Sequence, residues 1–317
     1  MSSPRVSILI PVYNRKKYIA ECIQSALDQT FTDHEIVVVD NASDDGTWEI
    51  CQQFAALNPR VRVLRNVENI GPVRNWMRCA QQARGEYSKI LFSDDLLEPN
   101  CIERMLVPLE NPEVSLVSCA ARVGQEKKNS KILYSATENS LIRKEKYLSL
   151  LLGHHVPFSP GAVFLRTKDL VNHLHDQFQT STPRPFDRHG AGPDVMIMLL
   201  TSENYPKVMC IREPLVFFRI HNDSFTISNL NNEISLGYVS AISYFLYKNK
   251  KKYFFLKFVV DSWLSSMIQQ KHWINLGLYL KINEGRGSFF EIFCGFLLLP
   301  FLLLLKISRR TIRRSKV

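Results

Sequence analysis

Two adjacent carboxylates, Asp94 and Asp95, follow the apolar segment Ile90-Leu91-Phe92. A short apolar run closed by polar residues is typical of a buried parallel strand. Ligands of open α/β sheets bind beyond the carboxyl ends of such strands, so we expect both carboxylates at the mouth of a crevice. Paired carboxylates suit Mg²⁺ or Mn²⁺, ions whose coordination substrate phosphates often complete. The alternative is that Asp94 caps a turn and Asp95 is solvated, as in many isolated motifs.

Strands and helices alternate along the chain around this motif. Predicted strands cover residues 5–13, 35–40, 61–64, 87–92, 114–119, 161–166 and 215–219. Predicted helices cover residues 18–27, 47–57 and 101–109, and another begins near Pro72 and ends before Gly85. This alternation predicts an α/β fold with a mostly parallel central sheet flanked by helices.

Cysteine usage and the first residues bear on the compartment. The seven cysteines are scattered and form no C-x-x-C pair, which argues against a disulfide framework and a zinc site. The start, Met1 to Arg5, lacks the layout of a signal peptide. We therefore expect a reducing, cytoplasmic environment.

The last third of the chain has a different composition. Residues 292–305 carry no charge and include Pro300, and residues 306–317 hold six basic residues and no acidic one. The apolar run is shorter than the roughly 20 residues of a spanning helix. It predicts an interfacial or re-entrant helix on an anionic membrane surface, within a helical extension covering 226–317. A full span and a buried core helix are the alternatives.

Polar clusters close three of the predicted strands. Residues 11–14 (Pro-Val-Tyr-Asn) follow the first strand, residues 40–47 follow the second, and Ser93-Asp94-Asp95 follows a later one. Another cluster, Asn69 to Asn75, lies between them. In order and spacing, residues 5 to 100 resemble the family 2 glycosyltransferases of the GT-A fold, and the resemblance weakens toward residue 225. It implies a Rossmann-like, nucleotide-binding catalytic domain over 1–225, with a nucleotide-sugar half over about 1–120 and an acceptor half over about 121–225.

The resemblance also implies roles for individual residues. Asp95 is expected to bind the divalent cation directly, and Asp94 to contact the ribose or orient the metal site. Asp40 is expected to accept a hydrogen bond from the nucleotide base, in a pocket lined largely by backbone atoms. The expected nucleotide-binding residues are Pro11, Val12, Tyr13, Asp40, Asp44, Arg74 and Asp94.

Two further segments resemble the family. Residues 217–224 have the form aromatic-Arg-x-His-x-x-Ser, which places His221 near the diphosphate or the metal. Asp194 stands at the predicted start of a helix and is the expected general base, with Asp187 as the fallback. Its alternative role is to complement the helix dipole. His154 and His155 are candidates for facing the acceptor.

The expected function is therefore inverting transfer of a sugar from a nucleotide-sugar donor, UDP- or dTDP-linked, to a glycan acceptor carried on a lipid. Cell-surface polysaccharide biosynthesis on the cytoplasmic side of the membrane is the setting that the family suggests. A non-catalytic nucleotide-binding partner in a membrane glycan-assembly complex is the alternative, because Ser93 replaces the first aspartate of the family's Asp-x-Asp motif. Nucleic-acid binding is not expected, since the sequence carries no motif for it.

Overall fold

The computed structural model describes residues 3–134, 138–178, 189–221 and 231–262, except 256 and 260. These residues fall into two compact units. The first comprises the described residues up to Gln177 together with 189–234, and the second comprises Phe178 and those from Ser235 onward. The candidate site lies in the first unit.

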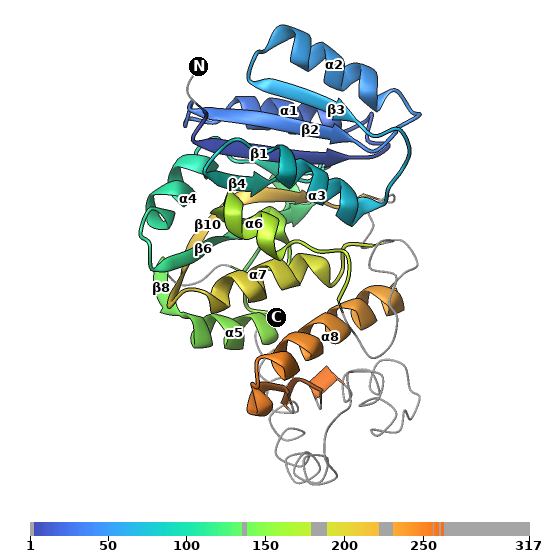
Figure 1. Ribbon diagram of the computed structural model, residues 1–317. Coiled ribbons are helices and arrows are strands. Elements are labelled where there is room, and N and C mark those ends of the chain that lie inside the picture. The colour runs from blue at the N-terminus through green and yellow to red at the C-terminus, as the bar shows by residue number, and fades with distance from the viewer. Residues whose placement is uncertain are drawn as a thin grey trace. The chain divides into compact units, whose positions relative to one another are not determined.

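The first half of this unit is a parallel sheet with connecting helices (Figure 1). Its strands are β1 (Val6–Val12), β2 (His34–Asp40), β3 (Val61–Arg65) and β4 (Tyr87–Ile90), in the spatial order β3-β2-β1-β4. Its helices are α1 (Ile19–Leu27), α2 (Thr47–Leu57) and α3 (Pro72–Gln82). Strands β1 and β2 are apolar nearly throughout because helices cover both faces of the sheet. The predicted α/β alternation is confirmed here.

The second half extends the sheet in the order β9-β6-β10-β5, with β7 beside β6 and β8 beside β10. Its strands are β5 (Leu96–Leu97), β6 (Val114–Gly124), β7 (Lys131–Leu133), β8 (Ser140–Arg143), β9 (Val163–Arg166) and β10 (Lys207–Arg219). Its helices are α4 (Cys101–Leu109), α5 (Lys144–Leu152), α6 (Thr167–His173) and α7 (Pro193–Glu203), with 3₁₀ turns η1 (Lys127–Asn129) and η2 (Pro160–Ala162).

The sheet is mixed, which corrects the expectation of a mostly parallel one. Strand β9 runs antiparallel to both β4 and β6, and β5, β7 and β8 run antiparallel to their neighbours. Hydrophobic pattern predicts that a strand exists, whereas its direction depends on the path of the chain between strands. That path was not readable from the residues after Asp95.

The direction of β10 decides which segments meet. Two antiparallel pairings, β4 with β9 and β9 with β6, give β4 and β6 the same direction, and β10 is parallel to β6. The carboxyl end of β10 therefore lies at the same sheet edge as those of β1, β2 and β4. This brings His221, just after β10, to Asp94, which is 127 residues earlier in the chain.

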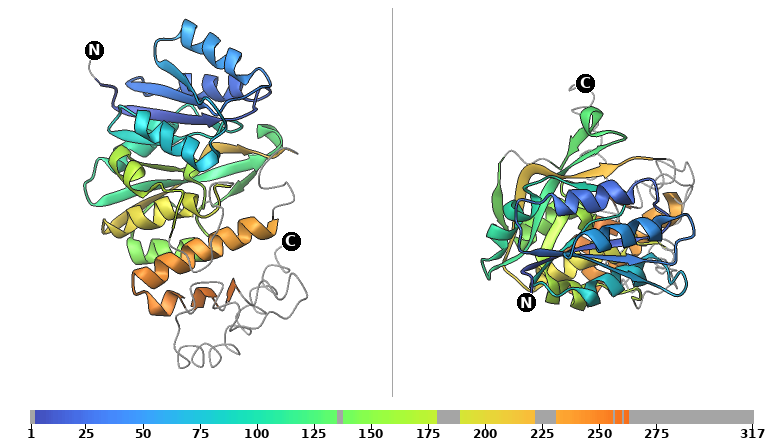
Figure 2. Two further views of the ribbon diagram at one scale, coloured as in Figure 1. Left: turned by 45° about the vertical axis from the view of Figure 1, so that its right-hand side comes forward. Right: turned by 90° about the horizontal axis from the view of Figure 1, so that it is seen from above.

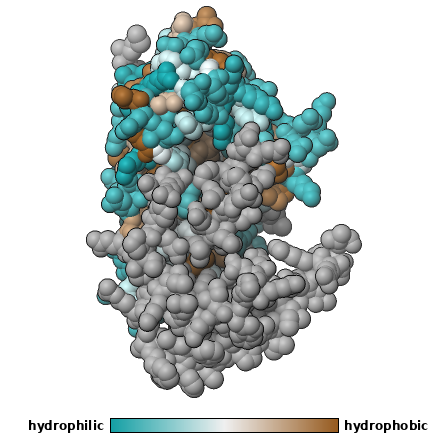
Figure 3. Space-filling view, turned by 90° about the vertical axis from the view of Figure 1, so that its right-hand side faces the viewer, coloured by the Kyte–Doolittle hydropathy of each residue, from teal (hydrophilic) through white to brown (hydrophobic). Residues whose placement is uncertain are grey.

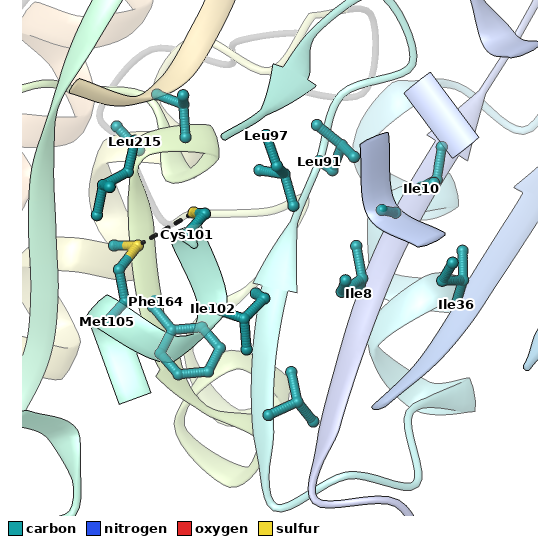
Figure 4. Packing of buried hydrophobic residues seen from close by; sticks show 14 of the residues in the cluster. Ile8, Ile10, Ile36, Leu91, Leu97, Cys101, Ile102, Met105, Phe164 and Leu215 are labelled. Atoms are coloured by element: carbon teal, nitrogen blue, oxygen red, sulfur yellow. Dashed lines mark hydrogen bonds between the residues drawn. The ribbon is translucent and has the colours of Figure 1, made fainter. Parts of the chain in front are cut away.

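The core fills both faces of the sheet. Helices α1, α2 and α4 pack on one face, and α3, α6 and α7 on the other (Figure 2). Figure 4 shows the first of these layers, where Ile8, Ile10 and Ile36 from the parallel strands pack near Ile102 of α4 and Phe164 of β9. All five are fully buried, and each such side chain stabilises the fold by about 1.5–3 kcal/mol. The sheet is therefore a rigid base for the polar loops at its carboxyl edge.

The surface and the second unit bear on the membrane prediction. On the face shown in Figure 3 the described residues are mainly hydrophilic, with hydrophobic residues scattered among them. In the second unit, α8 (Asn231–Lys248) places Tyr244 against Phe178, with ring centroids 6.1 Å apart. Within the described residues, no helix is both long and apolar enough to cross a membrane. The apolar run 292–305 and the basic tail 306–317 lie outside the described residues.

Candidate active site

The acidic motif lies at the carboxyl edge of the sheet, as predicted. Strand β4 ends at Ile90, and Leu91 still donates its N–H to Leu9 O at 2.9 Å. A tight turn follows, in which Asp95 N donates to Phe92 O at 2.9 Å. Asp95 is 8% exposed, and the side chain of Asp94 is 18% exposed. The motif therefore presents two carboxylates of different depth, Asp94 nearer solvent and Asp95 beneath it.

Basic side chains from two distant segments converge on these carboxylates. His221 Nε2 lies 2.9 Å from Asp94 Oδ2, and Arg15 Nε lies 3.6 Å from the same oxygen. Arg219 donates its backbone N–H to Asp95 Oδ1 at 3.0 Å and its Nε–H to the Asp94 carbonyl at 3.1 Å. The end of β10 thus holds both aspartates through backbone and side-chain contacts.

The prediction named His221 but missed Arg15 and Arg219. Both arginines stand inside the segments that predicted the site, Arg15 directly after Pro-Val-Tyr-Asn and Arg219 two residues before His221. Arginine side chains form paired hydrogen bonds with phosphate oxygens. An arginine next to a motif expected to bind a diphosphate could therefore have been predicted as part of the site.

Burial shapes the ionisation of the site. Desolvation and the neighbouring Asp94 charge raise the pKa of Asp95 well above its ordinary value. Beneath it, the fully buried Lys89 donates from Nζ to Ile90 O at 3.1 Å and to Gly161 O, and its burial lowers its pKa. Two carboxylates side by side repel each other, and a cation bound to them offsets that repulsion.

The donor set fits a divalent cation held partly by substrate. No group of three or more His, Cys, Asp or Glu side chains in the described part of the chain has the arrangement of a metal-ligand cage. Asp95 and Asp94 nevertheless supply hard oxygen ligands at one edge of the sheet. Mg²⁺ and Mn²⁺ are commonly bound by one or two carboxylates together with phosphate oxygens, and two carboxylates are what this site offers.

Asp40 ends β2 next to Val12 and is fully buried. Its Oδ2 accepts from Ser43 N at 3.1 Å and pairs with Arg65 Nε at 3.2 Å. Its Oδ1 is buried and has no hydrogen-bond partner among the described residues. An unsatisfied buried carboxylate oxygen is costly, so this atom is suited to accept an N–H from a ligand.

Two hydrogen bonds join the turn after β1 to the turn after β2, beside Asp40. Asn14 Nδ2 donates to Asp44 Oδ1 at 2.9 Å, and Asp44 N donates to Asn14 Oδ1 at 3.1 Å. Asn14 has a left-handed φ of 49°, a conformation that asparagine tolerates. Pro11 and Val12 are buried within β1, whereas Tyr13 is 41% exposed. Of these three side chains, only that of Tyr13 is open to a ligand.

A network of buried amides, which the sequence reasoning missed, supports the same edge. Asn66 Nδ2 donates to Asn41 Oδ1 at 2.7 Å and to Asn75 Oδ1 at 3.0 Å, and Asn75 Nδ2 donates to Val39 O at 3.0 Å. Arg74, predicted to bind nucleotide, is half exposed at the start of α3 and pairs with Asp176 at 2.7 Å. The asparagines fix the 66–71 loop against the ends of β2 and β3.

Asp194 lies in the first turn of α7, as predicted, and is 8% exposed. Its Oδ1 accepts from Gly192 N at 2.9 Å and from Val195 N at 2.7 Å. These contacts are those expected for the alternative role, in which Asp194 stabilises the start of the helix. Its role as a general base stays a prediction. Asp187 lies outside the described residues. His154 packs its ring 4.8 Å from that of Phe158 in the turn that also holds His155, and burial lowers the pKa of His154.

A mixed sheet with an acidic motif and a buried aspartate at one carboxyl edge is typical of a GT-A-like fold. Similarity to solved structures supports this fold. The S. aureus protein TarS, residues 1–349 in complex with UDP, superposes with a TM-score of 0.64 over 88% of this chain and 80% of that chain, at 18% identity. A mannosyltransferase, PcManGT from Pyrobaculum calidifontis in complex with GDP-Man and Mn²⁺, gives 0.53 over 98% of this chain and 83% of that chain, at 17% identity.

The chain belongs to the glycosyl transferase family 2, whose family model matches residues 7–174. Among curated relatives, the glycosyltransferase GlyG of Streptococcus pneumoniae is 35% identical over 36% of this chain and 38% of the relative. The chondroitin synthase of Escherichia coli is 35% identical over 48% of this chain and 22% of that protein. The matches thus span well under half the length of these two relatives.

Proposed function

We propose that this protein is an inverting, metal-dependent glycosyltransferase that moves a sugar from a UDP- or dTDP-linked donor to a glycan acceptor in cell-surface polysaccharide biosynthesis. The observation that carries the proposal is the convergence of Asp94, Asp95 and His221 at the sheet edge where β2 also presents Asp40. Family membership makes sugar transfer the expected chemistry of that edge.

In this proposal the base of the donor meets Asp40. The imide N–H of uracil or thymine would donate to Oδ1, the buried carboxylate oxygen that bonds no group in the described part of the chain. The other expected nucleotide contacts are Pro11, Val12, Tyr13, Asp44, Arg74 and Asp94. Arg74 reaches the nucleotide in this scheme only by loosening its pair with Asp176.

Asp95 is proposed as the direct ligand of a Mg²⁺ or Mn²⁺ ion, with His221 as the second candidate ligand. When bound, the ion would supply Lewis-acid neutralisation of the departing diphosphate. His221 now bonds Asp94 through Nε2, so it either holds that carboxylate or turns its nitrogen to the ion. Arg15 and Arg219 add positive charge around the same carboxylates and would attract the diphosphate to this edge.

Asp194 is proposed as the general base that accepts the proton of the acceptor hydroxyl. Its Oδ1 is oriented by the N–H groups of Gly192 and Val195. The acceptor half over about 121–225 contains this helix.

The acceptor is proposed to be lipid-linked, and the protein to act at the cytoplasmic side of a membrane as a peripheral or monotopic protein. This part of the proposal rests on the composition of the region 226–317, whose apolar run and basic tail suit an anionic lipid surface.

The test is a thermal-shift panel of UDP, dTDP, GDP and their sugar derivatives, with and without Mn²⁺. A ligand at about a hundred times its dissociation constant should add roughly 2.7 kcal/mol of stability. We expect a Mn²⁺-dependent shift with a uridine or thymidine nucleotide that Asp95→Asn abolishes. The matched control is Asp169→Asn, since Asp169 is 5% exposed but bonds the Tyr205 hydroxyl at 2.8 Å instead. Folded protein that shifts with no nucleotide would refute the proposal.

The alternative is a nucleotide-binding partner that catalyses no sugar transfer. It is considered because Ser93 replaces the first aspartate of the family's metal-binding motif. Asp194→Asn separates the two. Loss of sugar transfer with nucleotide binding preserved supports the enzyme, whereas a wild type that binds donor but transfers no sugar to a glycan primer supports the partner.

A further inference from the structure

Tyr18 lies between two residues of the candidate site that come from the far end of the chain. Its ring centroid is 4.6 Å from that of His221 at an interplanar angle of 37°, and Arg219 Cζ lies 5.1 Å from the same centroid. Tyr18 is 7% exposed. The ring therefore contacts both groups that hold the acidic motif.

The turn before α1 carries this tyrosine and is itself part of the site. Tyr18 N and Ile19 N both donate to Arg15 O at 2.9 Å, so Arg15 and Tyr18 belong to one hydrogen-bonded turn. Arg15 directs its guanidinium to Asp94, and Tyr18 directs its ring to His221, which also reaches Asp94. This turn therefore contacts Asp94 directly through Arg15 and indirectly through Tyr18 and His221.

The end of β10 is tied to α1 by further contacts. Arg219 Nη2 lies 2.5 Å from Glu21 Oε2, one turn along the helix from Tyr18. Cations are attracted to the face of an aromatic ring, and stacked planar groups lose rotational freedom about their side-chain bonds. Lys17 Nζ also lies 5.4 Å from the Tyr18 centroid, so the attraction is shared among several groups.

We propose that Tyr18 is a positioning residue, whose ring holds His221 with Nε2 on Asp94 and holds Arg219 against the acidic motif. Without this ring the imidazole would keep its bond to Asp94 but lose a packing contact that restrains its rotation. Partners that orient metal-site ligands typically change metal affinity by about 10–100-fold when they are lost. The effect on UDP binding rests on the proposed function, whereas the effect on the orientation of His221 can be measured without it.

The test compares Tyr18→Leu, which removes the ring, with Tyr18→Phe, which keeps its face. Tyr87→Leu is the matched control, because Tyr87 is 4% exposed and packs on Phe164 in the core. Titration calorimetry measures UDP affinity in the presence of Mn²⁺. We expect about a tenfold loss for Tyr18→Leu, and values within about twofold of wild type for Tyr18→Phe and Tyr87→Leu. Tyr18→Met fills similar space without a ring and replaces Tyr18→Leu if that variant does not fold.

Nitrogen-15 spectra of histidine-labelled protein give a second readout that needs no nucleotide. The His221 signals are assigned by their loss in His221→Gln. We expect Tyr18→Leu to shift them and Tyr18→Phe to leave them near their wild-type positions. Unchanged His221 signals in Tyr18→Leu, or an equal loss of UDP affinity in Tyr87→Leu, would overturn the inference. Absence of UDP binding by the wild type would instead count against the proposed function, and the spectra would still decide the role of Tyr18.

Discussion

Replacing Asp40 by asparagine tests base recognition separately from folding. Asp40 Oδ2 pairs with Arg65 Nε at 3.2 Å, but the Arg65 side chain is 40% exposed, so solvent compensates much of that loss. We expect a fall in unfolding free energy of no more than about 1 kcal/mol. The amide oxygen can still accept from Ser43 N, as Oδ2 does now at 3.1 Å. The pocket should therefore keep its shape.

Recognition of the base should change far more. In Asp40→Asn an NH₂ group takes the place of Oδ1, and two donors then face each other when uracil binds. A hydrogen bond to a charged group contributes about 1.5–3 kcal/mol, so UDP affinity should fall roughly 10- to 150-fold. Cytosine presents an acceptor at the same ring position, so CDP affinity should fall less or rise.

Titration calorimetry with UDP and CDP on both proteins measures this effect, and thermal unfolding monitors the fold. A variant that binds UDP within twofold of wild type would show that Asp40 does not meet the base. Equal losses for UDP and CDP, with a large drop in melting temperature, would show that Asp40 serves only the turn.

Two further predictions concern stability. Burial lowers the pKa of His34, so its neutral form stabilises the fold above the ordinary pKa of 6.5, and this contribution is lost as pH falls through the lowered value. Chemical denaturation should therefore show a steeper loss of stability from pH 7 to pH 5 in wild type than in His34→Gln, and equal slopes in the two proteins would contradict this reasoning. Asn75→Ala should cost about 2–4 kcal/mol, because it leaves buried hydrogen-bonding groups of Val39 and Asn66 without this partner. The exposed Asn129→Ala should stay within about 0.5 kcal/mol of wild type in the same denaturation series, and an equal loss in both variants would contradict the network argument.

Local patterns predicted most of the segment from β1 to β4. The four parallel strands and their helices lie within a few residues of their expected bounds, because each is a short apolar run or an amphipathic stripe closed by a turn signal. The same reasoning placed Asp40 and Asp94 at strand ends. It could not give the asparagine network around Asn66, since hydrogen bonds between side chains far apart in sequence depend on which strands are neighbours.

The sequence by itself determined the motifs and the chemistry that they allow. A carboxylate pair after a buried strand, an aspartate at the end of β2 and an Arg-x-His segment after a third strand were all readable, since residue type and spacing define them. Only the tertiary structure decided that these meet. Strand β9 enters the sheet antiparallel between β4 and β6, and two reversals of direction bring the end of β10 to the edge that holds Asp94. The contact of Tyr18 with His221 and Arg219 follows from that arrangement, because strand direction is set by the path of the whole chain and no local window contains it.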